Sequence, residues 1–195
     1  MKKIIIAAFI LAAFFTIPLN VCGAEGKREA SAPRNAGVIR GHYAAPRDGY
    51  AAGDIPKADL EAIVQAAVQA PSASNRQPWF FTVVQSLDLA KKIVPQTVEG
   101  NVIIVISTDG TTEREILDCG LATQSIYLAA QALGYGSRIH TGPIDNLNEN
   151  LKGELGFPEN RKAVALVRIG RLAENVDAAS AASARKSAGE TVTYK

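Results

Sequence analysis

Cysteine and histidine are scarce in this chain of 195 residues, which contains two of each. A structural zinc site needs about four such ligands at close spacing, and no such grouping is present. Cys119 lies within an almost wholly apolar stretch, a setting that predicts packing in a core rather than nucleophilic chemistry. We therefore predict no metal site.

The chain also lacks a strong charge of either sign. It has 21 basic and 19 acidic residues, and the basic count falls to 19 without Lys2 and Lys3, which belong to the amino-terminal segment treated next. No cluster of Lys and Arg with interleaved aromatic residues is present. We therefore predict no binding to nucleic acid.

The amino-terminal apolar run is too short to form a stable membrane span. It covers residues 4–17, whereas a spanning helix needs roughly 20 residues. Two lysines, an apolar run and small residues at Gly23 and Ala24 are together typical of a signal peptide. We predict a signal peptide of residues 1–24 and an exported, periplasmic or otherwise extracytoplasmic protein. Lipidation of Cys22, preceded by Leu19, is the alternative, and it would make the protein lipid-anchored.

Hydrophobic periodicity divides the rest of the chain into a flexible leader (25–37), one domain (38–172) and a carboxyl-terminal tail (173–195). Helices are expected at 56–68, 87–94, 113–133 and 145–155, and strands at 80–84, 101–106, 138–140, 163–170 and, in the tail, 190–194. The continuous apolar run 101–106 predicts a central strand covered on both faces. This alternation indicates an α/β domain of three layers.

The helix expected at 113–133 has apolar or small residues all round. A helix without a polar face is normally buried on every side. Burial on all sides is easier to achieve in so small a chain if a second subunit covers one face. The sequence therefore favours a homodimer.

A loop rich in hydroxyl and carboxamide groups joins the first helix to the first strand. Residues 70–79 read APSASNRQPW, and their prolines and serines prevent the helix from continuing. A carboxamide both donates and accepts hydrogen bonds, so it suits the edge of a planar heterocycle with alternating C=O and N–H groups. A capped turn without a ligand is the alternative interpretation.

This loop closely resembles the flavin-binding segment of the nitroreductase family, in which a helix ends in an APSxxNxQPW run before a strand. Residues 116–137 resemble the central helix of that family, which ends in a GxGS turn. The resemblance implies an α/β (α+β) three-layer fold whose mixed, largely antiparallel sheet is flanked by helices. It also implies FMN as the cofactor and a homodimer.

The resemblance further implies a set of FMN-binding positions. Loop groups at Pro71, Ser72, Ser74, Asn75 and Gln77 would serve the pyrimidine edge, and backbone amides of Thr141 and Gly142 would lie near flavin N5. The family's amino-terminal RxSxR phosphate pattern is missing here. Arg47, His42 and Arg185 are the phosphate candidates in its place, with Arg40 less favoured.

The implied activity is that of an FMN-dependent NAD(P)H oxidoreductase with a nitroaromatic, quinone or similar acceptor. Hydride would move directly to and from N5, so no side chain is required as a catalytic acid or base. Export conflicts with NAD(P)H as the donor, because NAD(P)H is not normally available outside the cytoplasm. A membrane carrier or partner protein could supply the electrons instead. A non-catalytic exported FMN carrier and a scaffold without cofactor are the alternative functions.

Overall fold

The computed structural model describes residues 43–110, 112–177 and 183–195. The predicted signal peptide, the leader, Arg40 and His42 lie outside these ranges. Within them, no helix is both long and apolar enough to cross a membrane.

A four-stranded sheet in the order β1-β2-β4-β3 forms the centre of the described domain. Its strands are β1 (Trp79–Val84), β2 (Val102–Thr108), β3 (Gly136–His140) and β4 (Lys162–Gly170). Each neighbouring pair is antiparallel. Every residue of β2 is buried, which confirms the prediction of a central strand covered on both faces.

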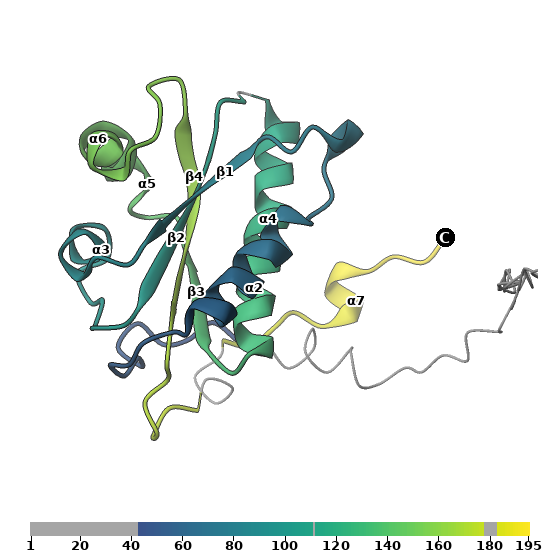
Figure 1. Cartoon of the computed structure of the whole chain (residues 1–195). Coiled ribbons are helices and arrows are strands. Elements are labelled where there is room, and N and C mark those ends of the chain that lie inside the picture. Colours follow the sequence, from purple (N-terminus) through teal and green to yellow (C-terminus); the bar gives the residue numbers. More distant parts are fainter. Residues whose placement is uncertain (1–42, 111, 178–182) are drawn as a thin grey trace, which may run out of the picture. The chain divides into compact units, whose positions relative to one another are not determined.

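Helices cover both faces of this sheet (Figure 1). One layer contains α2 (Lys57–Val68) and α4 (Glu113–Ala132). The other contains α3 (Leu87–Ile93) and a helical segment made of α5 (Ile144–Asn146), the π-helical turn η2 (Leu147–Leu151) and α6 (Lys152–Leu155). Alternate residues of β2 supply the two cores, with Ile104 facing α2 and α4 and Ile103 facing the opposite layer. The three-layer prediction is confirmed.

Helix α4 begins at a capping box. The Thr112 hydroxyl accepts from the Glu115 N–H, and the Glu115 carboxylate accepts from the Thr112 N–H. Cys119 lies fully buried on the sheet-facing side, as predicted, and burial raises the pKa of its thiol to about 11. The helix is not buried on every side within one chain, however. An apolar stripe stays exposed on its outer face, formed by Ile116, Leu117 and Leu121.

The predicted strand at 190–194 is wrong. The tail forms a helical turn, α7 (Ala188–Thr191), instead. Ser187 and Glu190 make a second capping box, in which the Glu190 carboxylate accepts from the Ser187 N–H at 2.8 Å. This hydrogen bond lowers the pKa of Glu190. The local cap therefore decides the conformation against the β-branched residues that suggested a strand.

A fully buried guanidinium group connects β4 to two other segments. Arg168 donates from Nε to Asn101 Oδ1 at 2.9 Å, and from its terminal nitrogens to the backbone oxygens of Arg47 at 3.0 Å and Gln96 at 2.7 Å. It also lies 4.0 Å from the ring centre of Tyr50. Burial lowers the pKa of Arg168, but an arginine keeps its charge in proteins. Neutral acceptors and one aromatic ring thus solvate a buried cation.

We expect Arg168→Met to lower the free energy of unfolding by about 3 kcal/mol or more, because it leaves several buried acceptors without a donor. Urea denaturation of the full chain measures this loss. Lys162→Met, at an exposed position of the same strand, is the matched control and should stay within about 0.5 kcal/mol of the wild type. Equal stability of Arg168→Met and the wild type would show that relief of a buried charge offsets the lost hydrogen bonds.

Candidate functional site

The loop of residues 71–77 has an unusual backbone conformation. Ser74, Asn75 and Gln77 have φ angles of 54°, 55° and 50°, in the left-handed region that non-glycine residues seldom occupy. No other non-glycine residue of the described chain has a positive φ. Such strain persists only where surrounding contacts enforce it, and it gathers at ligand-binding and active sites. The loop is therefore a candidate site on its geometry alone.

Hydrogen bonds from the loop's own residues and from α4 hold this shape. The buried Asp118 carboxylate of α4 accepts from the Ala73 N–H with both oxygens, at 3.1 and 3.2 Å. The Gln77 N–H donates to Ser72 Oγ at 3.0 Å, and the Gln77 carboxamide donates to the Asn75 carbonyl at 3.3 Å. Sequence reasoning missed Asp118. An acidic residue in the buried part of an otherwise apolar helix was the available signal.

These contacts leave three side chains of the loop available to a ligand, and one of them is Arg76, whose exposed guanidinium makes no ion pair with a described residue. The Asn75 carboxamide and the Ser74 hydroxyl are exposed and make no hydrogen bond to any residue that the structure describes. The side chains of Ser72 and Gln77 make their hydrogen bonds within the loop itself. Pro71 is exposed at the start of the loop.

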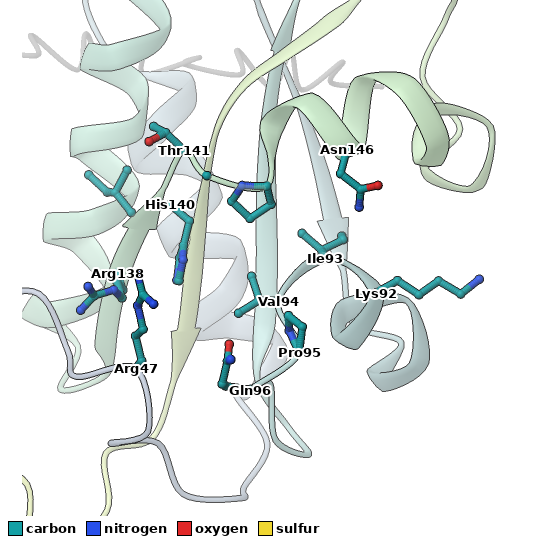
Figure 2. Close-up of a pocket in the computed structure, with 13 residues that line it drawn as sticks. Arg47, Lys92, Ile93, Val94, Pro95, Gln96, Arg138, His140, Thr141 and Asn146 are labelled. Atoms are coloured by element: carbon teal, nitrogen blue, oxygen red, sulfur yellow. The ribbon is translucent and has the colours of Figure 1, made fainter.

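A cavity elsewhere in the domain, which we call the β3 pocket, brings together three other predicted positions, namely Arg47, Thr141 and Gly142 (Figure 2). Its volume is about 520 Å³. Its walls come from the end of α3 and the residues after it, from the chain around Arg47, and from the end of β3 with the turn and α5 that follow. A Cβ atom at Gly142 would meet no atom within 4 Å, so this wall is open to an incoming group.

The β3 pocket carries positive charge without a carboxylate among its lining residues. Arg138 donates from Nη1 to the Ala45 carbonyl at 2.8 Å, and the Arg47 guanidinium makes no ion pair with a described residue. Lys92 is the third lining cation, and Glu154 pairs with it at 2.6 Å. The two arginines are therefore the cations available to an anion.

His140 lies beside these arginines. In Figure 2 its ring points towards Arg47 and Arg138. Burial, followed by the charges of Arg138, Arg168 and Arg47, lowers the pKa of His140 to about 4, so the imidazole is neutral at pH 7. Its Nε2 atom is buried without a hydrogen-bond partner among the described residues. A buried polar atom in this state indicates a missing water or ligand.

Within one chain the 71–77 loop is not part of the β3 pocket. The loop leads into β1, at the opposite edge of the sheet from β3, and three strand spacings separate those edges by roughly 14 Å. Arg185 does not line the pocket either. It is exposed in the tail and donates to the Ser183 carbonyl at 2.8 Å.

Arg138 was not predicted from the sequence as a site residue. Residues two apart in a strand share a face, so Arg138 and His140 point the same way from β3. Two polar residues on one face of a short strand were a signal that the face does not lie in the apolar core.

Comparisons with known proteins agree with this fold. A model of the nitroreductase family matches residues 45–102 and 95–171. An Archaeoglobus fulgidus protein named "Putative NADH dehydrogenase/NAD(P)H nitroreductase" is 34% identical over 133 residues, which are 62% of this chain and 76% of that protein. Two solved structures have the same fold. A Desulfitobacterium hafniense nitroreductase with bound FMN has a TM-score of 0.69 and 24% identity, over 84% of this chain and 99% of that one. A Desulfovibrio desulfuricans nitroreductase in complex with FMN has a TM-score of 0.71 and 21% identity, over 85% and 98% of the two chains.

We expect the neutral state of His140 to make the protein sensitive to acid. The pKa is about 4 in the folded state and about 6.5 when unfolded, so the unfolded chain takes up a proton first as the pH falls below 6.5. Stability should therefore decline between pH 6.5 and 4, by at most about 3 kcal/mol from this residue.

Urea denaturation of the wild type and of His140→Gln across this pH range measures that contribution. The other titrating groups are common to both proteins and cancel in the difference. Parallel pH profiles for the two proteins would contradict the prediction.

Proposed function

This chain belongs to the nitroreductase family, and from that premise we propose that it is an FMN-dependent oxidoreductase of the nitroreductase type. Electrons would pass from NAD(P)H or another reduced donor, through the flavin, to a nitroaromatic, quinone or similar acceptor. The observation that carries this proposal is the strained 71–77 loop, in which three left-handed residues present a free carboxamide.

The residues present fit FMN at both sites. The Asn75 carboxamide can donate to and accept from the pyrimidine edge, where C=O and N–H groups alternate. At the β3 pocket, the open wall at Gly142 allows close backbone approach. The turn and loop hydrogen bonds of the described chain include none donated by Thr141 or Gly142, so both N–H groups can serve a ligand. The arginines of the pocket suit a phosphate group.

When bound, FMN would supply the redox chemistry, accepting and returning a hydride at N5. The chain's own residues would bind and orient. Backbone N–H groups of Thr141 and Gly142 would donate hydrogen bonds beside the reacting edge and hold one face of the ring against the protein. The opposite face would remain open, first to the donor and then to the acceptor. No side chain need transfer a proton to the reacting atom.

A homodimer would join the two halves of this site. The loop and the β3 pocket lie at opposite edges of one sheet, so the loop of one subunit would have to reach the pocket of its partner. The exposed stripe on α4 offers the apolar surface for such pairing, with Leu117 exposed at 63%. Gly120 lies in the same stripe and has no atom near its missing Cβ, which permits close approach.

We propose further that the protein acts outside the cytoplasm, after removal of residues 1–24 or as a form lipidated at Cys22. The support for this proposal is the order of the amino-terminal sequence, with Lys2 and Lys3, the apolar run and the small residues. In that compartment a membrane carrier or partner protein would be the electron donor rather than NAD(P)H.

We expect the purified full chain to bind FMN with micromolar or tighter affinity, and Asn75→Ala to weaken this binding about tenfold, the value of one or two hydrogen bonds. Quenching of flavin fluorescence measures both constants. Gln85→Ala removes another exposed carboxamide, just past the end of β1 that is farther from the loop, and should bind FMN like the wild type. Absence of FMN binding by the wild type would refute the proposal.

Turnover separates the enzyme from an FMN carrier. Anaerobic addition of NADH, NADPH or a reduced quinone to the FMN-loaded protein should bleach the band near 450 nm with at least one donor. An acceptor should then restore it. Stable binding without bleaching by any donor would favour the carrier.

We expect Leu117→Glu to weaken dimerisation by about 100-fold or more, because it would bury a charge in an apolar interface. Light scattering after size-exclusion chromatography measures the mass, and FMN affinity should fall together with dimerisation. Leu133→Glu places the same change at an exposed position just past the other end of α4 and is the control. A monomeric wild type that binds FMN would refute the shared site.

A further inference from the structure

The β3 pocket contains two arginines that an anion could bind. Arg47 comes from the segment before α2, and Arg138 comes from the middle of β3. The Ala45 carbonyl holds one terminal nitrogen of Arg138, which leaves other N–H groups of that guanidinium without a partner among the described residues. A planar guanidinium fork suits the oxygens of a phosphate group.

The surroundings hold the backbone of Arg47 and one terminal nitrogen of Arg138 in place. The Arg47 carbonyl accepts from buried Arg168, and the Ala45 N–H donates to the Ser137 carbonyl of β3 at 3.0 Å. The backbone that carries Arg47 is therefore tied to the sheet on both sides. The Arg138 guanidinium, which the Ala45 carbonyl holds, therefore loses little conformational freedom when a ligand binds.

Resting on the proposed function, we propose that Arg138 and Arg47, with the Nε2 atom of His140, form the phosphate site for FMN and so select FMN over riboflavin. This site would replace the amino-terminal arginine–serine–arginine pattern that the chain lacks.

The spacing along β3 favours the phosphate of FMN as the occupant. Arg138 precedes Thr141 by three residues, about 10 Å of extended chain. The five-carbon ribityl chain and its phosphoester can bridge such a length. A flavin with N5 near the Thr141 and Gly142 amides could thus place its phosphate between the two arginines.

The neutral imidazole completes the site. His140 shares the face of β3 that carries Arg138 and lines the same pocket, and its Nε2 atom is buried without a partner among the described residues. As the Nε2–H tautomer it donates to a phosphate oxygen; protonated, it donates and also adds charge. Burial is the main cause of the lowered pKa of His140, and an anion between the arginines would oppose the further lowering that comes from their charges.

The test compares FMN with riboflavin, which differ only in the phosphate. Dissociation constants for both are measured by fluorescence quenching with the wild-type full chain, Arg138→Met, Arg138→Lys and Lys91→Met. Lys91→Met removes one charge from an exposed position of neighbouring α3 outside the pocket and is the control. Circular dichroism confirms that each variant is folded.

We expect Arg138→Met to weaken FMN binding about 10- to 100-fold and riboflavin binding less than about threefold. Arg138→Lys should retain part of the preference for FMN, and Lys91→Met all of it. Equal weakening of both flavins would mean that Arg138 only supports the fold through Ala45, and unchanged FMN binding would mean that the phosphate lies elsewhere. Either result overturns the assignment.

Failure of the proposed function itself gives a different pattern. The wild type would then bind neither flavin. Inorganic phosphate would be used as the probe to test whether the β3 pocket still binds a phosphate group. A rise in Tm with millimolar phosphate that is lost in Arg138→Met would retain the phosphate site without the flavin. No rise in the wild type would overturn it.

Discussion

The buried guanidinium of Arg168 is the interaction on which the geometry of the β3 pocket depends. Its three acceptors come from two segments far apart in the sequence, one at Arg47 and the other containing Gln96 and Asn101. Two of these residues, Arg47 and Gln96, line the pocket. A buried cation is tolerated only when its donors are satisfied. The hydrogen bonds that satisfy Arg168 in the core therefore also position the walls of the pocket. A stability determinant here is also a determinant of site geometry.

A buried charged group also holds the 71–77 loop, in this case a carboxylate rather than a guanidinium. One carboxylate, Asp118, fixes the Ala73 amide from the side of α4, and the loop then completes its shape with its own side chains. The strain at Ser74, Asn75 and Gln77 is stabilised by contacts that form only in the folded domain. The backbone that carries the Asn75 carboxamide is therefore preorganised, so only the side chain has to be ordered when a ligand binds.

The sequence predicted the helices, the central strand and the three layers, because these follow from local periodicity. It missed what depends on atoms brought together by folding. Asp118 and Arg138 read as ordinary polar residues until the structure sets them beside Ala73 and Ala45. The wrong prediction in the tail has a different cause. The Ser187–Glu190 capping box is visible in the sequence and indicates a helical turn, but the β-branched residues after it favoured a strand. The predicted roles of His42 and Arg185 in phosphate binding stay predictions.

The two sites are chemically incomplete in complementary ways. The loop offers the uncharged hydrogen-bonding groups of Ser74 and Asn75 beside the exposed Arg76 guanidinium, and the β3 pocket offers two arginines with an unpaired imidazole nitrogen. A ligand with an edge of alternating donors and acceptors at one end and an anion at the other suits this pair of sites. FMN has this asymmetry. One chain holds the two sites at opposite sheet edges, so under the proposed function two chains would have to share each flavin nucleotide. Binding of the cofactor and association of the subunits should therefore be thermodynamically coupled, each strengthening the other.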